Sequence, residues 1–314
     1  MIVVTGGAGF IGSNLVKGLN ERGISDILIV DNLEKAEKHK NLNSLDFYDF
    51  VDKRDFINHL SKFKDLNFEV IFHQGACSNT MEYNGRYMMQ NNYDYSKELL
   101  HFALENKIRF IYASSASVYG NGRNGFKEER TCEYPLNIYA FSKFLFDIYV
   151  RRLLKDSDIQ IVGLRYFNVY GPQENHKDKM ASVVFHFHNQ ILKEGKMKLF
   201  EGSENFKRDF VYVRDVVKVN LFFLDHPEKK GIFNCGTGKA RSFLDIAKIM
   251  KNLYEKAEIE FIPFPEVLKG KYQTFTEADL GNLRRAGYKE RFSSLEEGVT
   301  EYVKILKKSN GYWI

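Results

Sequence analysis

The chain has 314 residues, of which 44% are hydrophobic and 28% charged, and its formal net charge is +5 at pH 7. This balance is ordinary for a folded globular protein and excludes disordered, collagen-like and coiled-coil classes, while the length suits a nucleotide-binding half plus a smaller lobe. Lysines and arginines are scattered among acids, so we expect no nucleic-acid partner, and a mild positive balance suits an anionic small substrate.

The first half of the chain alternates strands with helices. Residues 1–5 (MIVVT) read as a buried strand, and from Phe10 the apolar positions take helical spacing until Gly23. We predict further strands at 27–31, 68–73, 109–115 and 159–167, with helices around 87–105 and 138–154. Strand and helix in alternation predict an α/β protein with a doubly wound, parallel, Rossmann-like sheet.

Beyond Asn168 this rhythm changes. A loop at 171–179 precedes a helix near 181–193, a strand-like stretch at 197–200 and the segment RDFVYVRDV at 208–216, and 231–238 reads as a strand and turn followed by helices near 242–256 and 294–307. This predicts a smaller, interleaved α/β substrate lobe. We place the dinucleotide-binding domain at 1–167, with 210–236 returning to it, and the substrate-binding lobe at 168–209 and 237–314.

A glycine-rich turn lies between the first strand and the first helix. The segment TGGAGFIG places Gly6, Gly9 and Gly12 there, where small residues allow a pyrophosphate to approach the backbone at a helix N-terminus. Asp31 ends the next strand and can bind the adenosine ribose, which favours NAD. Asn32, Lys35, Lys38, Lys40 and Lys53 follow, and cations there can neutralise the 2′-phosphate of NADP or form a solvated loop face. The residues alone leave the choice of cofactor open.

A tyrosine and a lysine four residues apart, Tyr139 and Lys143, are expected on one face of the helix around 138–154. A nearby ammonium lowers the pKa of a phenol, so the pair suits acid–base work. Ser115 ends the strand that we count as the fourth, at the carboxyl end of the sheet, where ligands of open α/β folds bind. Alone, the Tyr–Lys spacing is common on helix surfaces, and serines at such a position also cap turns.

Together, the glycine turn, Ser115 and the Tyr139–Lys143 pair resemble the extended short-chain dehydrogenase/reductase family, which includes nicotinamide-dependent sugar-nucleotide epimerases and dehydratases. The resemblance covers nearly the whole chain and implies that Ser115, Tyr139 and Lys143 match the Ser–Tyr–Lys set of the family. Dehydratase relatives usually carry an Asp-Glu pair after the equivalent serine. Ala116 and Ser117 stand there in this sequence, so dehydration is disfavoured.

Longer segments narrow the resemblance to family members that act on an ADP-linked heptose: HQGACS at 73–78, YMMQNNYDYSKELLHF at 87–102, LRYFNVYGP at 164–172, LFEGSENFKRDFVYV at 199–213 and LKGKYQTFTEADL at 268–280. The resemblance implies one tightly held NADP per subunit. The residues that it assigns to the cofactor are Gly6, Gly9, Phe10, Ile11, Gly12, Asp31, Asn32, Lys38, Lys53, Gln74, Gly75, Ala76, Cys77, Ser78, Asn91, Lys143 and Val169. Those that it assigns to the substrate are Asn168, His186, Phe200, Glu201, Gly202, Ser203, Arg208 and Tyr272.

A second base is also implied by the resemblance, at Lys177. From chemistry alone we would choose the adjacent His176, because imidazole titrates near neutrality, whereas Lys177 needs a pKa lowered by burial or by its neighbours. Lys179 departs from the family pattern, in which a serine often contacts the substrate, and we leave it out of the predicted site.

The implied function is that of an isomerase, an NADP-dependent epimerase that inverts C6 of an ADP-linked D-glycero-D-manno-heptose to the L-glycero-D-manno form. The reaction proceeds by transient oxidation to a ketone and hydride return. The family further implies a homo-oligomer, pentameric in known relatives, and a role in making the heptose precursor of a Gram-negative lipopolysaccharide core. Two alternatives stay open: an epimerase or reductase acting on another nucleotide sugar, and a non-catalytic NADP-binding regulatory protein.

The sequence also bears on membrane insertion, secretion, disulfides and metal binding. No apolar run approaches the length of a membrane-spanning helix, no secretion signal is recognised, and Cys77, Cys132 and Cys235 are widely spaced without a Cys-x-x-Cys pair. We therefore expect a cytoplasmic protein with no membrane partner and no disulfide framework. His73, His186 and His188 lack the spacing and acidic neighbours of a metal site, so we expect no metal.

Overall fold

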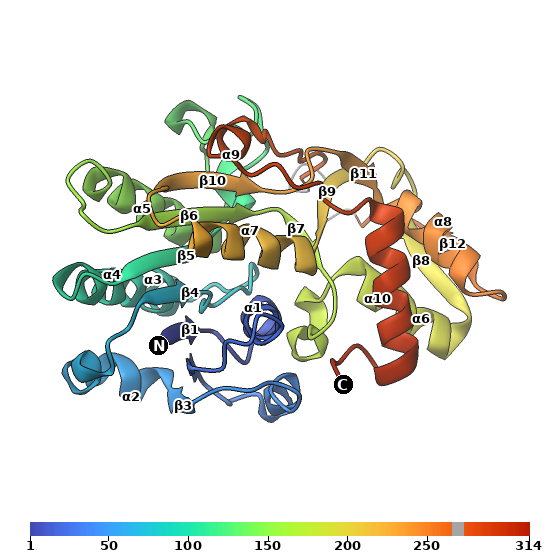
Figure 1. The fold of residues 1–314 in the computed structure, drawn as a ribbon. Coiled ribbons are helices and arrows are strands. Elements are labelled where there is room, and N and C mark those ends of the chain that lie inside the picture. The colour runs from blue at the N-terminus through green and yellow to red at the C-terminus, as the bar shows by residue number, and fades with distance from the viewer. Residues whose placement is uncertain (266–272) are drawn as a thin grey trace.

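The computed structural model describes residues 1–265 and 273–314. Its largest feature is a seven-stranded sheet in the order β10-β6-β5-β4-β1-β2-β3, in which every neighbouring pair is parallel (Figure 1). The order reverses between β1 and β4, which creates the crevice where ligands of such sheets bind. The strands are β1 Ile2–Thr5, β2 Ile27–Asp31, β3 Asp49–Asp52, β4 Val70–His73, β5 Arg109–Ser115, β6 Ile161–Tyr166 and β10 Gly231–Cys235.

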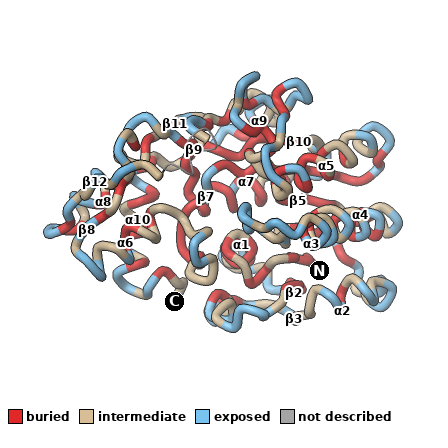
Figure 2. The backbone as a smooth tube through the Cα atoms, turned by 180° about the vertical axis from the view of Figure 1, so that it is seen from behind, coloured by how far each residue is buried: buried red, intermediate tan, exposed pale blue. Residues whose placement is uncertain are grey.

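Successive side chains of a strand point to opposite faces of the large sheet, so they pack into two different apolar cores. On β1, for example, Ile2 and Val4 belong to the core under α1 and α7, whereas Val3 belongs to the core under α2, α4 and α5. Figure 2 shows the buried strands in the middle of the molecule and the exposed turns around them. These helices are α1 Phe10–Asn20, α7 Val213–Asp225, α2 Lys53–Asn58, α4 Tyr95–Glu105 and α5 Ile138–Leu153.

A smaller lobe lies at one end of this sheet (Figure 1). It holds a three-stranded sheet in the order β11-β9-β7 and the pair β12-β8, and its own apolar core joins β8 and β9 to three helices. Its elements are β7 Asn168–Tyr170, α6 Val183–Glu194, β8 Lys196–Phe200, β9 Lys207–Tyr212, β11 Ala240–Ser242, α8 Phe243–Leu253, β12 Glu258–Ile262 and α10 Leu295–Ser309; the short helix α9 Gly281–Arg285 lies beside β10.

The predicted doubly wound parallel α/β fold is confirmed, with differences in detail. The strand that carries Ser115 is the fifth, because β3, a half-exposed edge strand, was not predicted. The helix expected around 87–105 is divided into α3 Gly85–Met89, a π-helical turn at Gln90–Asp94 and α4. The stretch at 208–216 ends β9 and begins α7, which packs against α1, and β10 pairs with β6 in the large sheet. Among the described residues, no helix combines the length and hydropathy that crossing a membrane requires.

Candidate active site

A cavity of about 570 Å³ opens at the carboxyl ends of the large sheet, beyond the paired strands β1 and β4. All the residues that we predicted to bind the cofactor line this cavity, and so do the four that we predicted to be catalytic. The predicted residues that line it are Gly6, Gly9, Phe10, Ile11, Gly12, Asp31, Asn32, Lys38, Lys53, Gln74, Gly75, Ala76, Cys77, Ser78, Asn91, Ser115, Tyr139, Lys143, Val169 and Lys177.

The glycine turn between β1 and α1 has no room for larger residues. Gly6 has a φ of +68°, and a Cβ added to Gly12 would lie 2.1 Å from the Gly6 carbonyl oxygen. Gly9 is the N-cap of α1, and no side chain there accepts from the first N–H groups of the helix. Backbone donors at a helix N-terminus, without side chains around them, fit the pyrophosphate of a dinucleotide.

At the other end of the cavity, the carboxylate of Asp31 is already hydrogen-bonded by the protein. One oxygen accepts from the Ala8 N–H at 2.9 Å, and the other accepts from the Lys38 ammonium at 2.6 Å and from the Asn32 N–H at 2.7 Å. The ammonium of Lys53 donates to the Asn91 side-chain oxygen at 2.8 Å. Lysines therefore line this end of the cavity beside two acids that are each ion-paired, Asp31 with Lys38 and Glu34 with Arg54.

Ser115, Tyr139 and Lys143 meet at the junction of β5 and α5. Ser115 caps the short 3₁₀ helix Ala116–Tyr119 by accepting from the Ser117 N–H at 3.2 Å, so the capping role that the sequence left open is present. The same side chain hydrogen-bonds the Tyr139 phenol. Lys143 is buried, and its ammonium donates to the Ala113 carbonyl at 2.8 Å. A serine, a phenol and a lysine side chain thus lie together at the edge of the cavity.

The pKa values of this set correct one expectation. Burial raises the pKa of Tyr139 above its usual value, the hydrogen bond with Ser115 lowers it, and Cys77 raises it further. The prediction that Lys143 lowers the pKa of Tyr139 is wrong in this structure, because desolvation of the phenol dominates and the ammonium is bonded to a backbone carbonyl instead. Burial also lowers the pKa of Lys143 to about 8.

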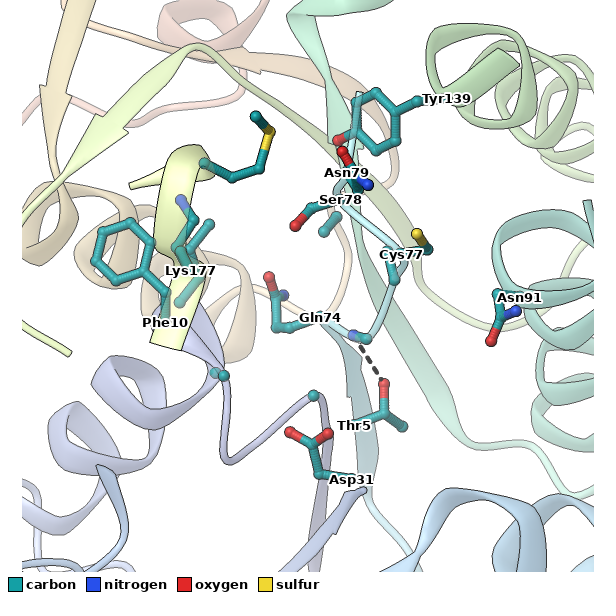
Figure 3. Close-up of a pocket in the computed structure, with 18 of the residues that line it drawn as sticks. Thr5, Phe10, Asp31, Gln74, Cys77, Ser78, Asn79, Asn91, Tyr139 and Lys177 are labelled. Carbon is teal, nitrogen blue, oxygen red and sulfur yellow. Dashed lines mark hydrogen bonds between the residues drawn. The ribbon is translucent and has the colours of Figure 1, made fainter. Parts of the chain in front are cut away.

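Lys177 approaches the cavity from the opposite side to Tyr139 (Figure 3). Its ammonium lies 4.8 Å from the centre of the Phe10 ring. Removal from water lowers the pKa of Lys177, and Glu174 raises it in part. The neighbouring His176 also lines the cavity, but burial and then the charges of Lys38, Lys177 and Lys35 lower its pKa to about 4. The imidazole that chemistry alone favoured is therefore a weak base here.

The residues predicted to contact the substrate lie in the smaller lobe and do not line this cavity. Asn168 on β7 pairs with Phe210 on β9, two residues from Arg208, so period-two alternation puts these side chains on one face. The guanidinium of Arg208 donates to the Lys207 and Gln273 carbonyls. His186 lies on α6, Phe200 ends β8, and Glu201 and Gly202 follow in a turn; Tyr272 lies outside the described residues.

Ser203 is the most buried of the predicted substrate residues that the structure describes, with 2% of its surface exposed. Its hydroxyl has no hydrogen-bond partner among the described residues. A buried hydroxyl without a partner is costly, which suits a group that is satisfied by a ligand.

Several further lining residues were absent from the predicted site. Three of them follow directly from the strand-end rule, because Thr5, Ser114 and Tyr166 sit at the carboxyl ends of β1, β5 and β6. The others come from helices and loops whose positions relative to the cavity are defined only in the folded chain: Glu34, Lys35, Asn79, Thr80, Tyr87, Tyr95, Phe167, His176 and Met180.

Comparisons with known proteins agree with this geometry. Residues 2–236 match the family described as "NAD dependent epimerase/dehydratase family". The chain is 61% identical over 316 aligned positions to the ADP-L-glycero-D-manno-heptose-6-epimerase of Brachyspira hyodysenteriae (strain ATCC 49526 / WA1), with 99% of each sequence covered.

Two solved structures extend the comparison. The crystal structure of Helicobacter pylori ADP-L-glycero-D-manno-heptose-6-epimerase is similar with a TM-score of 0.86 at 32% identity, covering 98% of this chain and 96% of that one. A UDP-glucose 4-epimerase of Thermus thermophilus, in complex with NAD, has a TM-score of 0.82 at 27% identity and covers 98% of this chain and 99% of that one.

Proposed function

Because this chain belongs to the NAD-dependent epimerase/dehydratase family, we propose that it is an NADP-dependent isomerase that inverts C6 of an ADP-linked D-glycero-D-manno-heptose. The product is the L-glycero-D-manno form. The similarity to ADP-heptose epimerases along almost the whole chain supports the substrate. The observation that carries the reaction type is the position of Tyr139 and Lys177 on opposite sides of one cavity (Figure 3).

Inversion by oxidation and reduction needs proton transfer at both faces of one carbon. A bound nicotinamide supplies the hydride acceptor and donor for this chemistry. One of Tyr139 and Lys177 removes the C6 hydroxyl proton as the carbon becomes a ketone, and the other donates a proton when the ketone is reduced from its opposite face. Ser115, which hydrogen-bonds the Tyr139 phenol, holds the reacting oxygen beside it, and Lys143 would bind the ribose of the nicotinamide. The net reaction consumes no cofactor.

The residues at the adenosine end support NADP over NAD. Two lysines, Lys38 and Lys53, line that end together with Glu34, and Asp31 is ion-paired with Lys38 and accepts from two backbone N–H groups. A carboxylate that is ion-paired in this way repels a 2′-phosphate less than a free carboxylate does. The lysine ammonium groups attract the phosphate. The glycine turn, together with Gln74 to Ser78, would hold the remainder of the dinucleotide.

We also propose the boundaries and assembly implied by the sequence. The dinucleotide-binding domain comprises 1–167 and 210–236, and the substrate-binding lobe comprises 168–209 and 237–314, with the smaller-lobe residues named above contacting the sugar nucleotide. The assembly is a homo-oligomer, a pentamer by resemblance, and its product serves the lipopolysaccharide core. Light scattering during gel filtration tests the assembly directly.

The activity test has two parts. First, mass spectrometry of the dinucleotide released from the purified protein should identify NADP, and titration should give tighter binding of NADP⁺ than of NAD⁺, with Lys38→Ala narrowing the difference. Second, NMR should show conversion of the ADP-D-glycero-D-manno-heptose to its C6 epimer. We expect Tyr139→Phe and Lys177→Met each to lower kcat by about 100-fold or more.

The outcomes separate the alternatives. Near-normal turnover by both variants would overturn the two-base proposal. Net consumption of NADPH on a keto sugar would indicate a reductase, inversion of a different nucleotide sugar would indicate another epimerase, and tight NADP binding without turnover of any sugar nucleotide would indicate a regulatory protein.

A further inference from the structure

Four buried charged side chains and a fifth that is about a quarter exposed, Arg151, form a cluster near Tyr139. Lys143, Asp147 and Arg151 stand four residues apart on α5 and therefore share one face of the helix. Arg165 comes from β6, and Glu133 comes from the loop before α5. The side chains of Arg165 and Glu133 are fully buried, and Asp147 is 0% exposed. Charges are removed from water only at considerable cost, so such a cluster next to a candidate active site calls for an explanation.

Asp147 connects three elements of the large domain. One carboxylate oxygen accepts from the Tyr112 hydroxyl at 2.9 Å. The other accepts from the Ser114 hydroxyl at 2.9 Å and from the Arg165 guanidinium at 2.9 Å. Arg165 in turn pairs with Glu133, which also pairs with Arg151. The carboxylate is thus satisfied by donors on both β5 and β6.

The bonds to β5 end directly before Ser115. Tyr112 and Ser114 donate to Asp147, and the carbonyl of Ala113 between them accepts from Lys143, one helical turn earlier on α5. Two residues one turn apart on the helix therefore bind three consecutive residues of the strand. This fixes the end of the strand that carries Ser115 relative to the helix that carries Tyr139 and Lys143.

We propose that Asp147 is a positioning residue for the Ser115–Tyr139–Lys143 set. It joins β5 to α5 at the point where the three side chains meet, and its negative charge holds Lys143 as an ammonium. The proposal rests on the function proposed above, because it assigns that site its supporting group. Asp147 itself does not line the cavity.

The effect of Asp147 on the pKa of Lys143 depends on the polar and charged groups that surround the ammonium. Asp147 and Tyr139 share α5 with it, the Ala113 carbonyl and Tyr112 come from β5, His73 comes from β4, and Arg165 of β6 faces it across Asp147. Burial lowers the pKa of Lys143, and the charge of Asp147 opposes that shift. Loss of this charge should therefore increase the fraction of neutral amine near pH 8.

Asp147→Asn tests the charge with little change of shape, and Glu133→Gln is its matched control. Both remove a buried carboxylate from Arg165, but only Asp147 acts on Lys143. The readouts are the affinity for NADP⁺ and kcat/KM with the ADP-heptose, each followed from pH 6 to pH 10. We expect Asp147→Asn to move the alkaline limb of both profiles to lower pH by about one unit, and Glu133→Gln to leave it in place.

The electrostatic role would be wrong if Asp147→Asn kept the alkaline limb of its pH profiles at the wild-type pH, or if Glu133→Gln shifted that limb by the same amount.

If Asp147→Asn does not fold, the double variant Tyr112→Phe with Ser114→Ala tests the connection between β5 and α5. It keeps every charge and removes both hydrogen bonds from β5 to Asp147. We expect it to lower kcat several-fold without moving the limb, and wild-type kcat would contradict the joining role. Binding of NADP⁺ needs no turnover. A shifted binding profile in a protein that fails to convert the heptose would therefore refute the proposed function and leave this inference standing.

Discussion

Asp178, next to the proposed base Lys177, has a backbone conformation that suits glycine. Its φ is +49° and its ψ is −124°. A side chain in this region costs about 1–3 kcal/mol, and such strain persists where the surroundings enforce it. The surroundings here include an ion pair between the Asp178 carboxylate and Lys35, whose ammonium also donates to the His176 carbonyl at 2.9 Å. The strained turn and its contacts hold the segment that presents Lys177 to the cavity.

Asp178→Gly and Asp178→Ala measure this strain. Both variants lose the ion pair, so the comparison isolates the backbone. Because alanine must adopt the same positive φ, we expect the glycine variant to be more stable than the alanine variant by about 1 kcal/mol, the reverse of the usual order. Urea unfolding of the two variants gives the difference. An alanine variant that is equally or more stable would show that the turn is unstrained.

His73 is a buried histidine whose hydrogen bonds keep it neutral. The Ser96 hydroxyl donates to the Asn92 carbonyl at 2.7 Å, so His73 Nε2 donates to Ser96, and Nδ1 accepts from the Thr5 hydroxyl at 2.6 Å. Burial, and then the charge of Lys143, lower the pKa of His73 to about 3 from the usual 6.5. The unfolded chain takes up this proton near pH 6.5 and the folded chain does not. The stability that His73 contributes is therefore complete above pH 6.5 and falls as the pH drops toward 3.

Between pH 7.5 and pH 5 this linkage should lower the free energy of unfolding by about 2 kcal/mol. His73→Gln removes the titrating group, so we expect the variant, although less stable at pH 7.5, to lose less stability over the same interval. His39→Gln, at an exposed position, serves as the control. Urea unfolding at the two pH values is the measurement, and the same pH-dependent loss in His73→Gln and wild type would contradict the assignment.

The π-helical turn at Gln90–Asp94 holds the loop at 74–78, which lines the cavity. Asn92, at its centre, accepts from the Cys77 N–H at 2.8 Å and donates to the Cys77 carbonyl at 3.0 Å. Its amide also lies 3.1 Å from the hydroxyl of Ser142 on α5. One side chain thus connects the loop at 74–78 to the helix that carries Tyr139. π-Helical turns inside α-helices are frequent at functional sites.

Asn92→Ala should leave the Cys77 N–H and carbonyl without their partner. We expect the free energy of unfolding to fall by about 2 kcal/mol and the affinity for NADP⁺ to fall with it, because the loop loses its support. Asn106→Ala, which removes a side-chain bond to the Phe102 carbonyl at the end of α4, is the control for stability without an effect on binding. Unchanged NADP⁺ affinity in Asn92→Ala would mean that the loop holds its shape without Asn92.

How far the sequence predicts this molecule depends on how local each signal is. The sequence predicts the fully buried strands and the helices with apolar faces, because hydrophobic periodicity and composition suffice to define them. It does not predict β3, β7, β11 and β12, because each is partly exposed and lacks a continuous apolar run, and it does not distinguish the π-helical turn from a continuous helix. Each of these strands forms only by hydrogen bonding to a partner strand from another part of the chain, which the local sequence does not show.

The candidate site divides in the same way. The glycine turn, Ser115, Tyr139 and Lys143 carry short motifs, so the sequence identified them. Asp147 carries none, because a buried acid is recognisable only once Tyr112, Ser114 and Arg165 are seen around it. The direction of the Tyr139 pKa was predicted wrongly for the same reason, since burial is a property of the folded chain.

Across the whole molecule, residues 310–313 join the smaller lobe to the nucleotide-binding helix. After α10, the carbonyls of Asn310 and Gly311 accept from Asn175 and from the Gln173 N–H, both at 2.8 Å. The indole N–H of Trp313 donates to the Asn14 side chain on α1 at 2.9 Å. Figure 1 shows this end of the chain beside α10 and the large domain. The segment therefore supports both the glycine-turn helix and the loop that leads to Lys177.

Trp313 is the single tryptophan of the chain, and it offers a test of this support. We expect Trp313→Ala to lower the free energy of unfolding by about 2 kcal/mol, and Trp313→Phe, which keeps a ring but loses the bond to Asn14, by about half as much. Urea unfolding followed by circular dichroism measures both. Wild-type stability in Trp313→Ala would show that the segment contributes little to joining the lobes.

We propose that this enzyme inverts C6 by oxidation and by return of the same hydride. The most direct measurement uses the ADP-D-glycero-D-manno-heptose carrying deuterium at C6, in ordinary water, with NMR and mass spectrometry of the product. We expect the C6 epimer, with deuterium retained at C6. Loss of the deuterium during inversion, or recovery of the substrate with no inversion, would contradict the proposal.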